Sequence, residues 1–170
     1  MVSSTSKSGG DFLTRKSDLT RLSKLLPSLR DILIVDDETF DADRLKATLR
    51  VMFGYELDLR RAATVASAVD QVIKRQPELI FLDDCLKPSD TATVTIPYLR
   101  RAGYAGPIIV ISGQVTRNRR RELIELGAAE VIHKDDVDSS RLAEAMLNVF
   151  MPGALQRPAT TDAQPFRRDE

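Results

Sequence analysis

The stretch ILIVDDE, residues 32–38, joins four apolar residues directly to three carboxylates. The apolar residues follow one another without the polar alternation of a strand that has one face in water. Such a run is typical of a strand in a parallel sheet that helices cover on both faces. In sheets of this kind ligands bind beyond the carboxyl ends of the strands, which is where the three carboxylates follow. The stretch therefore predicts both a fold class and the edge of the sheet where a site would lie.

The same pattern of apolar run, turn and amphipathic stretch repeats along the chain. Further apolar runs are a weaker YELDLRRA at 55–62, LIFL at 79–82, IIVI at 108–111 and AEVI at 129–132. Apolar residues recur at helical spacing between and after several of these runs. Together the five units predict a compact α/β domain with a doubly wound, five-stranded parallel sheet. Its third helix is the least regular, because Pro97 would interrupt it or delay its start.

The composition narrows the class of function. With 25 basic and 25 acidic residues the formal net charge is zero, which argues against the basic excess of many nucleic-acid-binding proteins. No apolar run approaches the roughly 18 residues of a membrane span, and the N-terminus lacks the apolar core of a secretory signal. We therefore expect a cytoplasmic protein without a membrane partner. Cys85 is the only cysteine and His133 the only histidine, which excludes an internal disulfide and a His-rich metal centre.

The chain divides into a folded region between two polar ends. Residues 1–16 are rich in Ser, Gly, Lys and Thr, and predict a disordered arm. Residues 17–28 predict a short helical extension with leucines on one face, and residues 30–150 predict the folded domain. Residues 151–170 contain three prolines and predict a flexible tail. We expect no DNA-binding or enzymatic domain after residue 150, since about 20 residues cannot fold into one.

Polar residues follow four of the apolar runs. They are Asp36, Asp37 and Glu38 after the first run, Asp83 and Asp84 after the third, Ser112 after the fourth and Lys134 close after the fifth. A parallel sheet would bring these chain-distant residues to one edge. Crowded carboxylates repel one another and favour a hard cation such as Mg²⁺. A hydroxyl and an ammonium group opposite them could hold an anion beside the metal, so the set predicts a site for phosphoryl chemistry.

In order and spacing, these motifs resemble the receiver domain of bacterial two-component response regulators over about residues 30–150. The motifs that carry the resemblance are ILIVDDE, PELIFLD, PIIVISG and GAAEVIHKDD. The resemblance implies a flavodoxin-like (βα)5 fold with strand order 2-1-3-4-5. It implies transfer of a phosphoryl group to one aspartate from a histidine kinase or a histidine phosphotransfer protein, with Mg²⁺ as cofactor. It further implies signalling to a downstream protein target, with no enzymatic turnover beyond slow self-phosphorylation from small donors and self-dephosphorylation, and it is compatible with a homodimer.

The resemblance also assigns roles to individual residues. These are the phosphoacceptor Asp83; the Mg²⁺ ligands Asp36, Asp37, Asp83 and the backbone carbonyl of Cys85; the phosphate-contacting Ser112 and Lys134; and the switch position Val131. Val131 departs from the family, which commonly has Tyr or Phe three residues before the lysine. A valine has no ring to swing inward, so we expect the coupling between phosphorylation and the rest of the domain to be weakened or routed differently.

Asp84 is the alternative phosphoacceptor, because two ways of counting disagree. Counting from Pro77 through the apolar run places the acceptor at Asp83, whereas counting back from Pro88 places it at Asp84. We prefer Asp83, because side chains alternate across a strand and a slip of one residue would turn the acceptor away from the site. The segment 84–95 is also several residues longer than the family's and lacks its glycine, so we expect a rearranged loop and third helix.

Two functions of other classes are compatible with these residues. A Mg²⁺-dependent phosphohydrolase also uses an aspartate nucleophile. That class has a second acid two residues after the nucleophile, a position that Cys85 occupies after Asp83 and Glu38 occupies after Asp36. A receiver-like adaptor that binds partners without phosphorylation would fit Val131 and the altered loop.

The basic run TRNRRR, residues 116–121, invites a nucleic-acid interpretation. Glu122 and Glu125 follow it and balance part of its charge. We therefore expect a solvated helix face rather than a nucleic-acid site.

Overall fold

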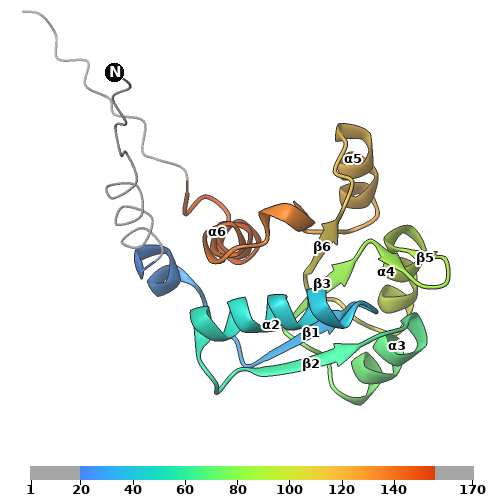
Figure 1. The fold of residues 1–170 in the computed structure, drawn as a ribbon, viewed down its shortest axis with the longest axis horizontal. Helices are drawn as coiled ribbons and strands as arrows, with labels where there is room; N and C mark the ends of the chain where they lie inside the picture. The colour runs from blue at the N-terminus through green and yellow to red at the C-terminus, as the bar shows by residue number, and fades with distance from the viewer. Residues whose placement is uncertain (1–19, 156–170) are drawn as a thin grey trace, which may run out of the picture.

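The computed structural model describes residues 20–155, and a parallel sheet of five strands forms its centre (Figure 1). The strands are β1 (Asp31–Val35), β2 (Asp58–Ala62), β3 (Leu79–Asp83), β6 (Ile108–Ser112) and β7 (Glu130–His133). They lie in the order β2-β1-β3-β6-β7, and neighbouring strands pair in parallel. Numbered among themselves, they have the order 2-1-3-4-5, which confirms the predicted flavodoxin-like fold.

The inner strands coincide with apolar runs because both of their faces are covered. All five residues of β1 and all five of β3 are buried. Within β1, Leu33 and Val35 belong to one hydrophobic core, and Ile32 and Ile34 belong to the core on the other face. Strand β2 lies at an edge and buries Ala62 alone, which explains why its run is the weakest in the sequence.

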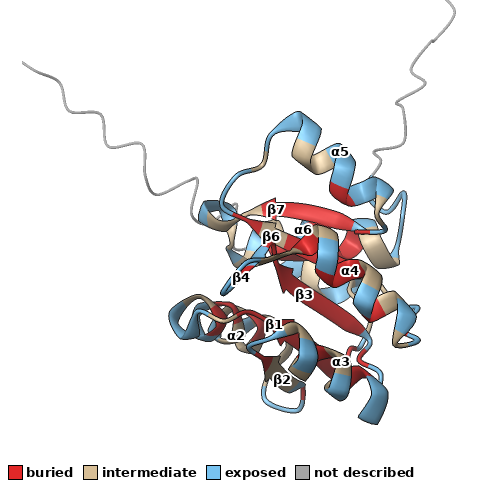
Figure 2. Ribbon diagram, turned by 90° about the vertical axis from the view of Figure 1, so that its right-hand side faces the viewer, coloured by how far each residue is buried: buried red, intermediate tan, exposed pale blue. Residues whose placement is uncertain are grey.

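Five helices between residues 39 and 150 cover the two faces of the sheet (Figures 1 and 2). They are α2 (Thr39–Phe53), α3 (Val65–Lys74), α4 (Ala92–Arg101), α5 (Arg117–Glu125) and α6 (Ser139–Phe150), with the 3-10 turn η1 (Lys134–Asp136) following β7. Side chains of α3, α4 and α5 pack into one core, and those of α2 and α6 pack into the other. This arrangement leaves the carboxyl edge of the sheet open between the two helical layers.

Three helices begin at a side-chain cap. Thr64, Thr116 and Asp138 each accept a hydrogen bond from the backbone N–H three residues further on, at 3.1, 3.1 and 2.8 Å. Each cap satisfies an N–H group that the helix itself leaves unpaired, and is worth about 1 kcal/mol. The caps therefore set where α3, α5 and α6 start relative to the strands before them.

The segment after β3 contains a small hairpin. Strands β4 (Cys85–Leu86) and β5 (Asp90–Thr91) pair antiparallel, and α4 begins directly afterwards. The expectation that Pro97 would interrupt or delay this helix was wrong, because α4 begins at Ala92 and runs through Pro97. Ile96 and Leu99 are fully buried beneath the helix, and this packing outweighs the one hydrogen bond that proline cannot donate.

The two ends of the chain are described only in part. Residues 20–25 are helical and lie within the predicted extension 17–28, and residues 151–155 form turns. Residues 1–19 and 156–170 lie outside the described part, so the disordered arm, the flexible tail and the predicted domain limits stay predictions. Between residues 20 and 155, no helix has the length and apolarity that crossing a membrane requires.

Candidate functional site

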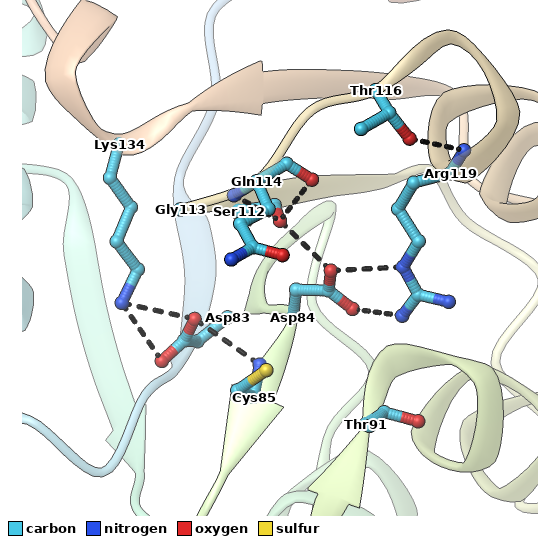
Figure 3. A pocket seen from close by; sticks show the side chains of 10 residues that line it. All are labelled: Asp83, Asp84, Cys85, Thr91, Ser112, Gly113, Gln114, Thr116, Arg119 and Lys134. Atoms are coloured by element: carbon cyan, nitrogen blue, oxygen red, sulfur yellow. Dashed lines mark hydrogen bonds and ion pairs between the residues drawn. The ribbon is translucent and has the colours of Figure 1, made fainter.

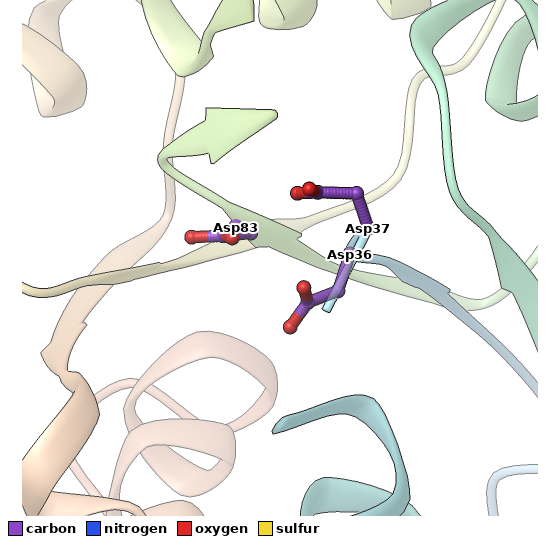
Figure 4. A group of neighbouring side chains, drawn as sticks. All are labelled: Asp36, Asp37 and Asp83. Atoms are coloured by element: carbon purple, nitrogen blue, oxygen red, sulfur yellow. The ribbon is translucent and has the colours of Figure 1, made fainter. Parts of the chain in front are cut away.

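Three carboxylates from the ends of two neighbouring strands lie together (Figure 4). Asp36 and Asp37 follow β1, and Asp83 is the last residue of β3. Each offers one oxygen, and these oxygens lie within 4.8 Å of one another. Asp36 and Asp83 are buried and Asp37 is partly exposed. Three hard oxygen donors at this spacing fit a divalent cation such as Mg²⁺.

The surroundings of Asp36 and Asp83 disfavour the ionised form of both carboxyl groups. Burial raises the pKa of Asp36 to about 6 from its ordinary value of 3.8, with the charge of Asp83 adding to the rise and the Glu38 N–H opposing it. That N–H donates to Asp36 Oδ1 at 2.8 Å. Burial also raises the pKa of Asp83, against the opposing effect of the Lys134 ammonium. A bound cation would relieve both costs.

Lys134 lies against the cluster from the end of β7. Its Nζ is 3.2 Å from Asp83 Oδ1 and 3.3 Å from Asp41 Oδ2. Burial of the ammonium group works against its charge, but the neighbouring carboxylates, led by Asp83, outweigh this and raise the pKa of Lys134. The lysine is therefore charged and oriented toward the oxygens of Asp83. Asp41, in the first turn of α2, is a carboxylate of the site that the sequence interpretation missed.

Asp83 and Asp84 face different surroundings, as alternation along a strand requires (Figure 3). Asp83 joins the carboxylate cluster and Lys134. Asp84 instead receives two hydrogen bonds from the guanidinium of Arg119, one of them at 3.1 Å, and one from the hydroxyl of Ser112 at 2.9 Å. The geometry thus separates the preferred acceptor from its alternative.

Ser112 is bonded to Asp84 rather than to Asp83. Its Oγ also accepts from the Gln114 N–H at 3.2 Å, and the Gln114 carbonyl lies at the same distance. Ser112 nevertheless lines the same open cavity of about 540 Å³ as Asp83 and Lys134. The hydroxyl predicted to contact phosphate is therefore near the acceptor, with its proton directed to another carboxylate.

Arg119 is an exception within the basic run, of which Thr116, Arg117, Asn118 and Arg121 are exposed as expected. Its side chain is only 21% exposed, and besides Asp84 it donates to Thr93 Oγ1 at 2.9 Å and to Glu122 Oε2 at 2.8 Å. The carboxylates of Asp84, the largest influence, and of Glu122 raise the pKa of Arg119. Sequence reasoning missed this contact because it joins residues 35 positions apart on two different elements.

Cys85 and Val131 occupy the remaining predicted positions. The Cys85 N–H approaches Asp83 Oδ1 at 3.4 Å, and its exposed thiol lines the cavity. Burial and then the two neighbouring aspartates raise the pKa of that thiol. Val131 is buried in the core beside Leu123 of α5, and its carbonyl accepts from Arg120 Nη1 at 2.9 Å. The assigned role of the Cys85 carbonyl as a metal ligand stays a prediction.

Two further basic residues support the acidic loop after β1. Arg61 donates to the carbonyl oxygens of Asp36 at 3.1 Å and of Asp37 at 3.0 Å. Lys87, in the hairpin turn, pairs with Glu38 at the rim of a second cavity of about 330 Å³. Neither contact could be predicted, since Arg61 sits in a weak strand and Lys87 in a loop of unusual length.

The chain matches the family model of the response regulator receiver domain over residues 32–147, and it belongs to this family. Solved receiver structures support the assignment. The receiver domain of NtrX from Brucella abortus is 29% identical with a TM-score of 0.60, over 69% of this chain and 98% of that chain. The BeF3-activated N-terminal receiver domain of RstA from Klebsiella pneumoniae is 22% identical with a TM-score of 0.60, over 70% and 97% of the two chains, and shows the shared fold.

A longer chain of NtrX from Brucella abortus is 26% identical with a TM-score of 0.63 over 71% of this chain. The match spans 26% of that longer chain. No curated protein matches the chain. The predicted family and fold are thus confirmed, and the roles of individual site residues are taken up as proposals.

Proposed function

We propose that this receiver domain accepts a phosphoryl group on Asp83 from the phosphohistidine of a kinase or a phosphotransfer protein, and that it passes the signal on through protein contacts. The observation that carries the proposal is the position of Asp83, which lies both in the carboxylate cluster and against Lys134. Asp84 has neither neighbour and is already paired with Arg119. The acceptor role therefore falls to Asp83.

Asp36, Asp37 and Asp83 would hold Mg²⁺, with the Cys85 carbonyl as a further ligand. When bound there, the cation supplies positive charge that allows an anionic phosphoryl group to approach a carboxylate. The raised pKa values of Asp36 and Asp83 agree with a site whose charge balance is incomplete without a cation. Arg61 supports the ligand geometry by fixing the carbonyls of Asp36 and Asp37.

The chemical step then needs little from the protein beyond position and charge. A carboxylate oxygen of Asp83 attacks phosphorus, and the new O–P bond forms as the P–N bond to the donor histidine breaks. The electron pair of that bond stays on the imidazole, which takes up a proton. Lys134, whose Nζ lies against Asp83, would place its ammonium group beside the phosphoryl oxygens and stabilise their negative charge.

Labelling with a small phosphodonor tests the acceptor. The wild type and the variants Asp83→Asn and Asp84→Asn are incubated with acetyl phosphate and Mg²⁺ and compared by intact mass. We expect the wild type and Asp84→Asn to gain one phosphoryl group that is stable in acid and labile in alkali, and Asp83→Asn to gain none. Labelling of Asp83→Asn, with loss in Asp84→Asn, would move the acceptor to Asp84.

A receiver-like adaptor is the second candidate, and one observation favours it. The hydroxyl of Ser112 already donates a hydrogen bond to Asp84, so this donor has an acceptor without a phosphoryl group. The same labelling experiment separates the two functions, since an adaptor of this kind takes up no phosphoryl group from acetyl phosphate or from phosphorylated kinases.

A further inference from the structure

An ion pair between the buried Asp84 and the partly exposed Arg119 lies beside Asp83 and connects four elements of the fold (Figure 3). Asp84 follows β3, and Arg119 lies in the first turn of α5. Through Ser112 the pair reaches the end of β6, and through Thr93 it reaches the first turn of α4. The acceptor chemistry described above uses neither Asp84 nor Arg119. The contacts of the buried Asp84 and of Arg119 are therefore available for another role.

Ser112 makes this pair sensitive to what happens at Asp83. A serine hydroxyl has one proton, so it can donate a hydrogen bond to one strong acceptor at a time. In the structure the nearer acceptor, and the charged one, is Asp84 Oδ2 at 2.9 Å, while the carbonyl oxygen of Gln114 lies at 3.2 Å. A phosphoryl group on Asp83, in the same cavity, would offer oxygens of greater negative charge. Donation to the phosphoryl group and donation to Asp84 exclude each other.

We propose that the Asp84–Arg119 ion pair couples phosphorylation of Asp83 to the position of helix α5. The coupling rests on the proposed acceptor function. When the Ser112 hydroxyl turns to the phosphoryl group, the buried carboxylate of Asp84 loses one of its donors. A buried acceptor that loses a donor is destabilised until its surroundings rearrange. Arg119 is the other partner of Asp84, so its side chain would change position in response. Because Arg119 belongs to α5, the helix would shift with it.

Helix α5 is the element that this change can move. It buries a single residue, Leu123, whereas α6 buries five. The polar contacts of α5 with the domain come mainly from two arginines. Arg119 pairs with Asp84 and donates to Thr93, and Arg120 pairs with Glu130 and donates to the Val131 carbonyl. Figure 2 shows the helix as mostly exposed, with one buried segment toward the sheet. Loosening the contacts of Arg119 would remove one of the two side chains that make most of these polar contacts.

The side chain of Val131 is unsuited to couple Ser112 to α5, which leaves this role to the ion pair. The valine is fully packed in the core with Leu123, and it has no polar atom in its side chain that could follow the Ser112 hydroxyl. Asp84 and Arg119 occupy the path from Ser112 to α5 directly.

The test uses amide NMR spectra of the full chain with Mg²⁺, with and without beryllofluoride as the phosphoryl mimic. Arg119→Gln removes the positive charge that forms the ion pair with Asp84. Arg121→Gln is the matched control, because Arg121 is exposed on the same helix and its side chain contacts Asn118. We expect beryllofluoride to shift the amides around Asp83 in all three proteins. We expect the shifts along α5 to occur in the wild type and Arg121→Gln, and to be lost in Arg119→Gln.

Each other outcome has a definite meaning. Equal α5 shifts in the wild type and Arg119→Gln would overturn the proposed coupling, as would a wild type in which Asp83 responds and α5 does not. Absence of any response around Asp83 in the wild type would instead contradict the acceptor function and remove the basis of the coupling. If Arg119→Gln does not fold, Asp84→Asn breaks the same ion pair from the other side and is read in the same way.

Discussion

Asp36 is held in surroundings that oppose its charge, and this has a consequence for stability. Its pKa is raised in the folded protein, so the folded state binds a proton at Asp36 more tightly than the unfolded chain does. The stabilisation that follows is complete below the unfolded value of about 4, and is lost as the pH rises through about 6. At neutral pH the ionised carboxylate destabilises the metal-free protein.

Replacing Asp36 with asparagine should therefore stabilise the metal-free protein at pH 8. Asparagine keeps an acceptor for the Glu38 N–H and removes the buried charge. We expect the free energy of unfolding in urea to rise by about 2 kcal/mol at pH 8, and the gain to vanish near pH 4. Asp43→Asn, at an exposed position of α2, is the control and should show little change. A variant no more stable than wild type at pH 8 would contradict the electrostatic cost assigned to Asp36.

The site residues differ in how far sequence could reveal them. Asp36, Asp83 and Lys134 directly follow or end strands, and the rule that parallel strands share a carboxyl edge was enough to bring them together. The partner of Ser112 could not be found in that way. It depends on which side of β3 each aspartate faces and on the reach of Arg119, and both are set by tertiary packing.

Among the connecting elements, the turn before β6 is held by close packing of a glycine against a tyrosine. Tyr104 is buried, and its hydroxyl donates to the Pro107 carbonyl at 2.8 Å. A Cβ atom on Gly106 would lie 2.6 Å from that hydroxyl oxygen and 2.7 Å from the ring carbon that bears it. The ring has no room to retreat, because it is enclosed by the core.

Gly106→Ala should for this reason destabilise the protein by about 1–3 kcal/mol, the usual cost of overpacking. Gly113→Ala offers a matched control, since a Cβ at Gly113 meets no atom within 4 Å. Thermal unfolding of both variants beside the wild type measures the difference. Similar melting temperatures for the two variants would show that the contact between Gly106 and Tyr104 relaxes without cost.

The strands and helices also differed in how well the sequence predicted them. The buried strands β1, β3 and β6 stand out as continuous apolar runs, whereas β2 is recognisable mainly from its place in the repeat, because most of it is not buried. Helix α4 shows the opposite case. From local structure alone we expected Pro97 to interrupt or delay the helix. The helix is continuous through Pro97, because burial of Ile96 and Leu99 stabilises it.

For the whole molecule, the acidic cluster makes stability depend on divalent cations. A cation that binds the folded state and not the unfolded chain raises the free energy of unfolding in proportion to the logarithm of its concentration. We expect millimolar Mg²⁺ to raise the melting temperature at pH 8 and EDTA to reverse the effect. The rise should shrink below about pH 6, where Asp36 takes up a proton that the cation must displace.

Asp36→Asn provides the comparison for this measurement. It removes one ligand, so the same addition of Mg²⁺ should raise its melting temperature much less than that of the wild type. An identical rise in both proteins would place the cation elsewhere on the molecule.

The short edge strand β2 also bears on how copies of the molecule can meet. The outer side of an edge strand presents backbone N–H and C=O groups that a strand of another molecule can extend. β2 is five residues long and contains Arg60 and Arg61, whose guanidinium groups are tied to Asp31 and to the loop after β1. A charged edge this short opposes the addition of a further strand. The β2 edge is thereby protected from aggregation through extension of the sheet.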